Sequence, residues 1–384
     1  MNLSYWERTS FFEQADYTII GAGIVGLFCA LEIKNKQPEA NVLLLERSLL
    51  PNGASTKNAG FACFGSLSEL IVQLEKSSEE ELLDLVRLRW EGLKKLKSSL
   101  GENEIELEVN GGYELFSEQD EELWKECISK IEYFNSLLKK IIPGEEDVYQ
   151  IKDEKIIDLG FKNVEHLIFN PYEAQIHSGK MMERLIHKCL TAGVKILNGF
   201  EVVGFKNNSN EIEINMIDLQ SKNISLSTKK LLLCTNAFVH KLIPDIDVKP
   251  GRGQVFITKP IENLKVKGTF HYDEGYFYFR NIDDRILIGG GRNLDFEKET
   301  TTDFGITKLV KNKITELLNT IILPDVAWEY DMEWSGIMAF GNELKPIIQE
   351  LEPNVYCAVR CNGMGVAMGS KIGETLASLA IEKL

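Results

Sequence analysis

The sequence of 384 residues lacks long apolar runs: none reaches the roughly 18 residues that a membrane-spanning helix needs. Its first segment, MNLSYWERTSFFEQAD, has no basic stretch leading into an apolar one, so no signal peptide is predicted. Positive charge is also scarce, since 43 Lys and Arg stand against 58 Asp and Glu, a formal net charge of −15. This balance argues against binding to nucleic acids or to anionic membrane surfaces.

Cysteine pairs at redox or metal-binding spacing are absent. The seven cysteines are scattered and odd in number, and none forms a CxxC motif. We therefore expect neither a disulfide framework nor a zinc site, and a reduced, cytoplasmic location fits better. The five histidines show no metal-ligand spacing with another His, Cys or acid. We predict no metal, and we expect His177 and His271 to be structural rather than catalytic.

Apolar and charged residues are abundant, at 44% and 26%, which is enough to bury a large core. At roughly 150 residues per domain, the length suggests two to three domains. Apolar positions recur at helical spacing over 69–100 and again over 118–140. A third helix is predicted over 178–192, with Ser178 as its N-cap.

A hairpin is predicted where two strand-like segments, 275–280 and 285–289, flank four polar turn residues. Side chains alternate between the two faces of a strand. This alternation places Tyr276, Tyr278 and Arg280 on one face of the first strand, and the phenylalanines between them on the other.

The most informative segment combines a glycine-rich turn with two apolar strands. Residues 17–20 have strand character and lead into Gly21-Ala22-Gly23-Ile24-Val25-Gly26, and a second strand, 42–45, ends in Glu46. The first glycine allows a tight turn, the second lets backbone approach a pyrophosphate, and the third lets a helix pack against the strand. The helix N-terminus offers N–H groups to phosphates, and Glu46 can accept hydrogen bonds from a ribose. The pattern predicts a dinucleotide site but does not by itself decide between FAD and NAD.

The loop after Glu46, residues 47–60, is small and polar. Such a loop can lie along a long cofactor, whereas a nicotinamide dinucleotide protein would usually go directly to another helix and strand. At this point the sequence resembles the FAD-dependent amine and amino-acid oxidases, the family of D-amino-acid oxidase, glycine oxidase and sarcosine oxidase. The resemblance covers nearly the whole chain, and its further matching segments are Gly53–Gly60, Leu231–Ala237, Pro250–Val255, Arg285–Gly291 and Asn362–Ser370.

The resemblance implies FAD as the cofactor. Gly363 and Gly365 permit close backbone approach, and the helix that starts near Gly369 points its positive end toward the flavin N1–C2=O edge. Sarcosine-oxidase relatives carry a flavin-linked Cys near residues 336–338, where this chain has none, so we predict non-covalent FAD. The implied FAD contacts are Gly21, Ala22, Gly23, Ile24, Val25, Gly26, Glu46, Arg47, Ala54, Ser55, Thr56, Asn58, Ala59, Gly60, Val202, Val203, Cys234, Thr235, Asn236, Gly336, Arg360, Asn362, Gly363, Met364, Gly365 and Val366.

Two tyrosines are predicted to form the side of the active site that faces the substrate. By resemblance, tyrosines on this strand bind substrate in several family members, so Tyr276 and Tyr278 are predicted to hold a substrate over the flavin ring. The chain departs from the amino-acid oxidases at Met338, which stands where many of them have an Arg that pairs with the substrate carboxylate. A thioether cannot replace a guanidinium fork.

Two explanations of this departure stay open. Either another cation binds the carboxylate, with Arg280, Arg292 and Arg360 as candidates, or the substrate is not a simple α-amino acid. Arg360 lies just before the C-terminal glycine turn, which by resemblance is near the flavin. We therefore predict Arg360 as a residue of the catalytic site, together with the two tyrosines and Met338.

The expected fold class is α/β, or α+β overall: a doubly wound, Rossmann-like FAD-binding domain with a second, smaller domain built on an antiparallel sheet. The FAD-binding domain is predicted to be discontinuous, from residues 1–84, 150–245 and 330–384. The substrate domain is predicted from residues 85–149 and 246–329.

The function implied by the resemblance is a FAD-dependent oxidoreductase that oxidises the C–N bond of a primary or secondary amine or amino acid by hydride transfer to the flavin. A neutral amine needs no strong enzymic base, so the lack of a Ser-His-Asp signature does not count against it. The expected partners are a small-molecule substrate and O2 or another electron acceptor. The alternatives are a FAD-dependent 2-hydroxy-acid dehydrogenase, a non-catalytic flavin-binding subunit, and an NAD-linked dehydrogenase. The oligomeric state stays open.

Overall fold

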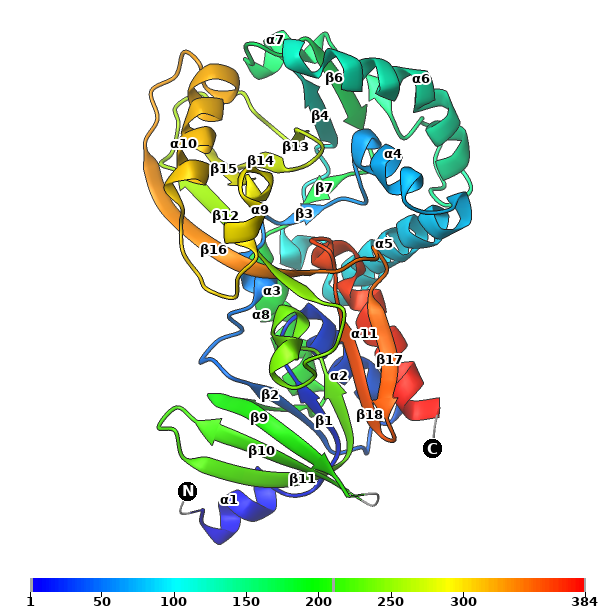
Figure 1. Cartoon of the computed structure of the whole chain (residues 1–384), viewed down its shortest axis with the longest axis vertical. Coiled ribbons are helices and arrows are strands. Elements are labelled where there is room, and N and C mark those ends of the chain that lie inside the picture. Colours follow the sequence, from blue (N-terminus) through cyan, green and yellow to red (C-terminus); the bar gives the residue numbers. More distant parts are fainter. Residues whose placement is uncertain (1–2, 209–210, 383–384) are drawn as a thin grey trace.

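The computed structural model describes residues 3–208 and 211–382, and these form two lobes, each built on an eight-stranded sheet (Figure 1). Four parallel pairings hold together the sheet of the lower lobe in that view. Its order is β17 (Ile347–Glu352), β18 (Val355–Val359), β11 (Asn223–Leu233), β1 (Ala15–Ile20), β2 (Val42–Glu46) and β8 (Lys195–Asn198), with β10 (Ile212–Asp218) paired to β11 and β9 (Phe200–Asn207) paired to β10. This is the doubly wound sheet that the sequence predicts.

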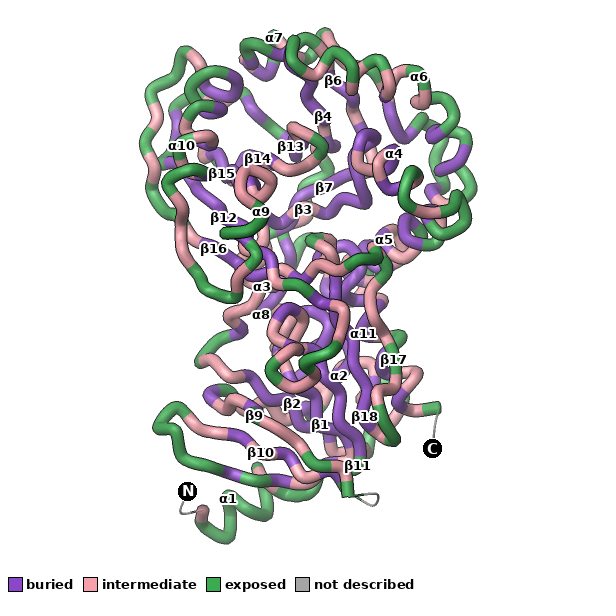
Figure 2. The backbone as a smooth tube through the Cα atoms, in the orientation of Figure 1, coloured by how far each residue is buried: buried purple, intermediate pink, exposed green. Residues whose placement is uncertain are grey.

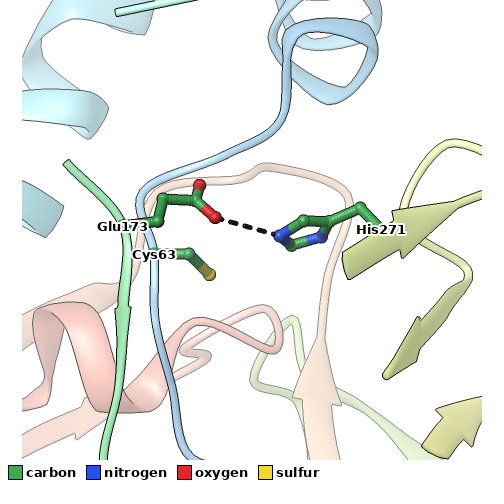
Figure 3. Close-up of side chains that lie close together, drawn as sticks. All are labelled: Cys63, Glu173 and His271. Atoms are coloured by element: carbon green, nitrogen blue, oxygen red, sulfur yellow. Dashed lines mark hydrogen bonds and ion pairs between the residues drawn. The ribbon is translucent and has the colours of Figure 1, made fainter. Parts of the chain in front are cut away.

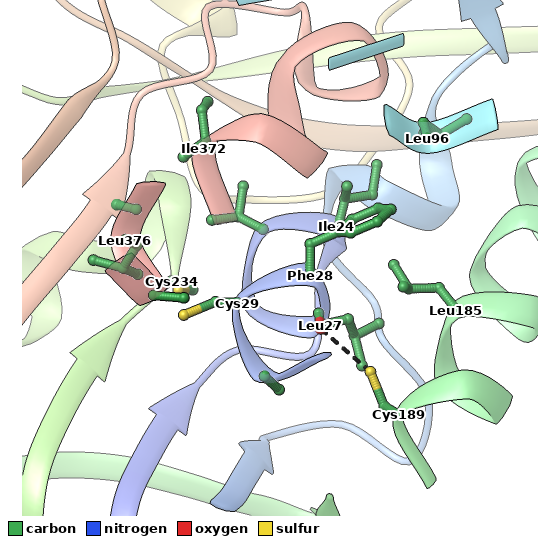
Figure 4. Packing of buried hydrophobic residues seen from close by; sticks show 14 of the residues in the cluster. Ile24, Leu27, Phe28, Cys29, Leu96, Leu185, Cys189, Cys234, Ile372 and Leu376 are labelled. Atoms are coloured by element: carbon green, nitrogen blue, oxygen red, sulfur yellow. Dashed lines mark hydrogen bonds between the residues drawn. The ribbon is translucent and has the colours of Figure 1, made fainter. Parts of the chain in front are cut away.

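Helix α2 (Ile24–Lys36) connects β1 to β2 and is apolar on most sides, as expected of a helix buried between a sheet and other helices. Figure 4 shows Leu27 and Phe28 of this helix packed among side chains of neighbouring helices. The Cys189 thiol of α8 (Ser178–Thr191) donates a hydrogen bond to the Leu27 carbonyl at 3.2 Å. On the other side α11 (Gly365–Glu382) approaches so closely that a Cβ on Gly373 would lie 2.6 Å from the Val25 carbonyl oxygen. The close contact requires glycine there.

The second sheet forms the upper lobe in Figure 1 and is mostly antiparallel. Its order is β16 (Tyr330–Phe340), β12 (Lys249–Thr258), β15 (Arg285–Gly290), β14 (Phe277–Ile282), β13 (Thr269–Tyr272), β4 (Gly112–Phe116), β6 (His166–Asn170) and β5 (Gln150–Ile151). A short pair, β3 (Phe61–Ala62) and β7 (Ala174–Gln175), lies apart from both large sheets. Figure 2 shows buried backbone along the strands and more exposed backbone on the outer helices.

The predicted hairpin is confirmed as β14 and β15, but its turn is shorter than expected. Asn281 and Ile282 continue β14, so only two residues lie between the strands, and Asp283 adopts a left-handed φ of 49°. Phe277 and Phe279 face the core beneath α10 (Lys308–Leu317), as the alternation predicts. The other face of β14 is therefore free to meet the lower lobe.

The predicted helices are present with altered ends. Residues 69–100 divide into α4 (Leu67–Glu75) and α5 (Glu79–Leu100), because Ser78 caps the second helix by accepting from the Glu81 N–H. The N-cap of α8 is His177 rather than Ser178, since the His177 Nδ1 accepts from the Lys180 N–H at 3.2 Å. The remaining helices are α1 (Tyr5–Ser10), α3 (Ala54–Lys57), α6 (Glu121–Leu138), α7 (Lys155–Leu159) and α9 (Phe296–Glu299).

The sheet pairings differ in two places from the predicted domain ranges. β5 and β6 fall within 150–245 and β16 within 330–384, yet all three belong to the second sheet. The exact domain boundaries stay a prediction, and the residues 1–2, 209–210 and 383–384 of those ranges lie outside the described residues. Among the described helices, none is both long and apolar enough to cross a membrane.

Candidate active site

A cavity of about 690 Å³ lies between the two sheets, at the carboxyl ends of the parallel strands. Its lower side is formed by the ends of β1, β2 and β11, the start of α2, the loop around α3, and the turn that leads into α11. Its upper side is the face of β12, β14 and β16. Crevices at the carboxyl ends of parallel strands are where α/β folds bind nucleotides.

The structure brings most of the predicted site residues to this one cavity, although they come from segments spread over the whole sequence. Their contacts with a cofactor or substrate stay a prediction. Those that line the cavity are Gly21, Gly23, Ile24, Val25, Glu46, Arg47, Ala54, Ser55, Asn58, Ala59, Gly60, Val202, Cys234, Thr235, Asn236, Tyr276, Tyr278, Gly336, Met338, Asn362, Gly363, Met364, Gly365 and Val366.

The structure does not place Ala22, Gly26, Thr56, Val203 or Arg360 in the lining. The Thr56 hydroxyl instead donates to the Pro51 carbonyl at 2.6 Å and so fixes its own loop. Val203 is 50% exposed, because neighbouring strand residues face opposite ways and Val202 takes the inward position. A residue's position within a matching sequence segment therefore does not decide whether its side chain lines the cavity or supports a neighbouring loop or strand.

The glycine turn is built by close backbone packing. Gly21 has a φ of +106°, and a Cβ there would lie 2.7 Å from the Cys234 carbonyl oxygen. A Cβ on Gly26 would lie 2.0 Å from the Gly21 carbonyl oxygen, so this glycine lets α2 start directly against the turn. The Ala22 N–H donates to the Glu46 Oε2 at 3.2 Å, which ties the turn to the end of β2. These contacts explain why Ala22 and Gly26 support the cavity without lining it.

The lining fits a dinucleotide with a flavin ring. The Thr235 hydroxyl is buried at the end of β11 and has no hydrogen-bond partner among the described residues. At the turn that leads into α11, a Cβ on Gly365 would meet nothing closer than the Cys361 Cβ at 3.8 Å, and one on Gly363 only the Met338 sulfur at 3.9 Å. A buried hydroxyl without a partner and open space beside two glycines fit a cavity that holds a cofactor.

Arg360, predicted as a residue of the catalytic site, does not line the cavity. Its guanidinium is buried away from the cavity and forms ion pairs with Asp247 and, at 3.3 Å, with Glu343. Its Nε donates to the Lys345 carbonyl at 2.9 Å. These contacts with two carboxylates and a carbonyl hold the end of β18 against the loop after β16. A contact of Arg360 with a substrate stays a prediction, which these ion pairs disfavour.

The upper side of the cavity presents aromatic hydroxyls and a thioether. The hydroxyls of Tyr276 and Tyr278 form no hydrogen bond within the described part of the chain, and burial raises the pKa of Tyr278 to about 12. A Cβ on Gly253 would lie 2.9 Å from the Met338 methyl carbon and 3.8 Å from the Tyr278 hydroxyl oxygen. Met338 and Tyr278 therefore share one patch of the cavity wall, over the glycines of β12.

Three buried side chains that the sequence did not connect meet beside this patch: Cys63, Glu173 and His271 (Figure 3). Their ligand atoms lie within 4.8 Å of one another, close enough for a set that could hold a metal ion. The His271 Nε2 lies 3.2 Å from the Glu173 Oε2. The absence of metal-ligand spacing in the sequence could not exclude such a cluster, because its members come from three separate segments. That the protein binds no metal stays a prediction.

The charges around His271 are unusual for buried groups. Burial alone would lower the pKa of His271, but the Glu173 carboxylate, with Glu69 and Glu114 farther off, raises it to about 9. Burial raises the pKa of Glu114 to about 7, although Ser68 donates hydrogen bonds to it. Burial also raises the pKa of the Cys63 thiol, and Glu173 adds to this effect. At neutral pH the raised pKa values keep His271 protonated beside Glu173 and keep Cys63 as a neutral thiol.

A doubly wound sheet with a dinucleotide turn, facing a tyrosine-bearing antiparallel sheet across one cavity, defines the class of two-lobed flavin oxidoreductases. The chain belongs to the DAO family of FAD dependent oxidoreductases, which it matches over residues 16–379. The family resemblance read from the sequence and the assignment of FAD as cofactor are thereby confirmed.

Individual relatives are distant. The probable oxidoreductase OrdL of Haemophilus influenzae is 18% identical, over 95% of this chain and 82% of that protein. L-proline dehydrogenase from P. horikoshii superposes with a TM-score of 0.75 at 19% identity, covering 97% of this chain and 94% of the other. Glycine oxidase from Geobacillus kaustophilus gives a TM-score of 0.74 at 17% identity, covering 96% and 95%. Likenesses at this identity show a shared fold.

Proposed function

We propose that the protein oxidises a C–N bond of a small amine or amino acid, with non-covalently bound FAD as the group that accepts the electrons. The observation that carries the proposal is the single cavity in which the glycine turn of a FAD family member faces two unpaired tyrosine hydroxyls. Structural neighbours point the same way, since they include a proline dehydrogenase, glycine oxidases and an iminodiacetate oxidase.

The lower side of the cavity would hold the cofactor. The turn at Gly21 and the N-terminus of α2 would take the pyrophosphate, and Glu46 would take the adenosine ribose. The carboxylate of Glu46 is already oriented by the N–H groups of Ala22 and Ser48, at 3.2 and 3.0 Å. The bound FAD would supply hydride-accepting chemistry that no side chain of the protein can provide.

Non-covalent attachment is supported by the state of the nearby thiols. Cys63 and Cys361 line the cavity, but burial raises the pKa of both, that of Cys361 to about 12. A thiol with such a pKa is a weak nucleophile at neutral pH, because only the thiolate attacks. Acid precipitation of the purified protein tests this point: the flavin colour should stay in the supernatant, and a yellow pellet would contradict it.

The upper side would position the substrate. The Tyr278 hydroxyl, with a pKa of about 12, stays protonated and can donate a hydrogen bond, while its ring limits the access of water to the reacting carbon. His271 is held protonated by Glu173 and is therefore not available as a base. The substrate would accordingly react as a neutral amine, with its orientation set by the wall.

Anaerobic bleaching of the flavin tests the proposal directly. The holoprotein is mixed without oxygen with D- and L-amino acids, N-methyl amines, polyamines and 2-hydroxy acids, and its visible flavin absorbance is followed. At least one amine or amino acid should bleach the flavin. Bleaching by hydroxy acids alone would show C–O chemistry, and no bleaching by any compound would favour a non-catalytic flavin subunit.

A further inference from the structure

Two arginines line the cavity, Arg47 just after β2 and Arg292 near Tyr276, and neither forms a hydrogen bond or ion pair within the described part of the chain. Arg292 lies two residues after the end of β15 and lines the cavity. Its guanidinium forms no hydrogen bond or ion pair with any residue in 3–208 or 211–382. The other two arginines named from the sequence are engaged elsewhere: Arg360 with two carboxylates, and Arg280 with the Ile176 carbonyl at 3.0 Å, outside the cavity lining.

Aromatic rings hold the Arg292 side chain while leaving its donors free. The guanidinium carbon lies 3.9 Å from the ring centre of Phe340 and 4.8 Å from that of Phe296. A ring face attracts the charge of a guanidinium but does not replace a carboxylate as the acceptor for its N–H groups. The rings therefore orient the side chain without satisfying its N–H groups, which is the state of a site prepared for an anion.

The backbone register places Arg292 beside Met338. Gly251 of β12 pairs with Met338 of β16, and a Cβ on Gly251 would lie 3.3 Å from the Arg292 Cδ. Gly253 lies two residues after Gly251 on β12 and therefore on the same face, where it is close to the Met338 methyl group and the Tyr278 hydroxyl. Paired residues and alternate residues of a strand share one face of a sheet. Arg292, Met338 and Tyr278 thus face the same part of the cavity.

The electrostatic surroundings keep this cation charged and place acidic groups near it. Burial lowers the pKa of Arg292, but a guanidinium starts so high that it stays protonated at neutral pH. Glu69 and Glu274 line the same cavity, and Tyr276 lies within electrostatic reach of both and of Arg292. The cavity therefore offers a positive group and negative groups, which suits a molecule that carries both an amine and a carboxylate.

We propose that Arg292 binds the substrate carboxylate, in place of the arginine that Met338 replaces, so that the substrate is an amino acid rather than a simple amine. The inference rests on the proposed function and adds the substrate class. The planar fork of Arg292 matches the two oxygens of a carboxylate, and the Tyr276 and Tyr278 hydroxyls are the neighbouring donors. Its free N–H groups together with its place near the tyrosines distinguish it, because Arg280 and Arg360 lie outside the cavity lining and Arg47 lies after β2, on the side proposed for the cofactor.

The test measures binding rather than turnover. The holoprotein is titrated with acetate, propionate and benzoate, and with the matching uncharged amides, while the flavin difference spectrum and the heat of binding are recorded. Three variants are compared with the wild type: Arg292→Met, Arg292→Lys and Arg285→Met. Arg285 is the matched control, because it begins β15, at the opposite end of the strand from Arg292, and pairs with Asp331.

The wild type and Arg285→Met should bind a carboxylate more tightly than its amide. Arg292→Met should bind the carboxylate at least about tenfold more weakly, since a hydrogen bond to a charged group is lost, and should bind the amide unchanged. Arg292→Lys should retain part of the preference, because it keeps the charge but loses the fork. Flavin content reports folding of each variant.

Two results would overturn the inference. One is an equal preference for carboxylates in the wild type and Arg292→Met, and the other is no carboxylate preference in the wild type. If Arg292→Met loses its flavin, the same comparison is made with Arg292→Lys, for which a full wild-type affinity would contradict the proposed fork. The proposed C–N oxidation would fail separately, through the absence of amine-dependent bleaching in the wild type.

Discussion

The Nε2 of His271 lies 3.2 Å from the Oε2 of Glu173, and both side chains are buried beside the cavity. The pair couples β13 to the residue just before β7, and thus joins the large antiparallel sheet to the two-stranded sheet of β3 and β7. A buried imidazolium is stable only because the carboxylate compensates its charge. The contact is therefore expected to make the stability of the whole protein depend on pH.

The first prediction concerns this pH dependence. The pKa of His271 is about 9 in the folded protein, above its ordinary value of 6.5. Since the folded state keeps a proton that the unfolded chain releases, the stabilisation is complete below pH 6.5 and is lost as the pH rises to 9. Urea unfolding followed by fluorescence at several pH values should show this loss, and Glu173→Gln should remove it and cost about 3 kcal/mol at pH 6.

Glu114→Gln is the control for this measurement. Burial raises the folded pKa of Glu114 from 4.5 to about 7. The contribution of Glu114 to stability is therefore lost as the pH rises from 4.5 to 7. The glutamine variant should flatten the stability curve in that lower window and keep a decline above pH 6.5, which ends at a slightly lower pH because Glu114 also helps to raise the pKa of His271. If the decline persists in Glu173→Gln as well, another group causes it and the assignment to His271 is wrong.

The second prediction is that Gly26→Ala disrupts cofactor binding through the backbone. The added Cβ would lie 2.0 Å from the Gly21 carbonyl oxygen, so α2 must shift from the turn. We expect a loss of about 1–3 kcal/mol in unfolding free energy, as for other overpacked sites, together with reduced flavin content. Gly204→Ala on β9 is the matched control, because no atom lies within 4 Å of its added Cβ. Equal flavin content in both variants would count against the proposed role of the turn.

The third prediction separates cofactor binding from stability. Gly365 starts α11 and has open space around it, with the Cys361 Cβ at 3.8 Å as the nearest neighbour of an added Cβ. Gly365→Leu should therefore fold, but its side chain would occupy the space assigned to the flavin. Purified Gly365→Leu should carry much less FAD while the unfolding midpoint of its flavin-free form matches that of the flavin-free wild type. Wild-type flavin content would refute the placement of the flavin at this turn.

The local parts of this site could be predicted from the sequence. The Gly21–Gly26 turn is specified by neighbours within the motif, and the faces of β14 follow from strict alternation at Phe277 and Phe279. The family resemblance adds the order of distant segments, which local patterns do not contain. These local features depend on contacts between residues that lie close together in the sequence.

The fate of single charged residues could not be predicted. Nothing in the sequence around Arg292 and Arg360 indicates which of them is neutralised within the protein. Only the fold shows that Asp247, far away in the sequence, and Glu343, from the loop after β16, form ion pairs with Arg360. The cluster of Cys63, Glu173 and His271 likewise has members about a hundred residues apart, so no spacing rule could find it. Long-range pairing decides which charges are structural and which remain for a ligand.

The last prediction concerns metal binding at that cluster. At neutral pH the His271 imidazole is protonated and the Cys63 thiol is neutral, because the pKa values of both are raised. Coordination requires a neutral imidazole and a thiolate, so a metal ion would have to displace two protons and break the contact with Glu173. We therefore expect elemental analysis of the dialysed holoprotein at pH 7 to find far less than one zinc ion per chain, even after incubation with zinc. Any weak uptake should increase at pH 9 and disappear in Cys63→Ser. One tightly held ion per chain at pH 7, lost in that variant, would show that the cluster is a metal site and that the buried charged pair is not its resting state.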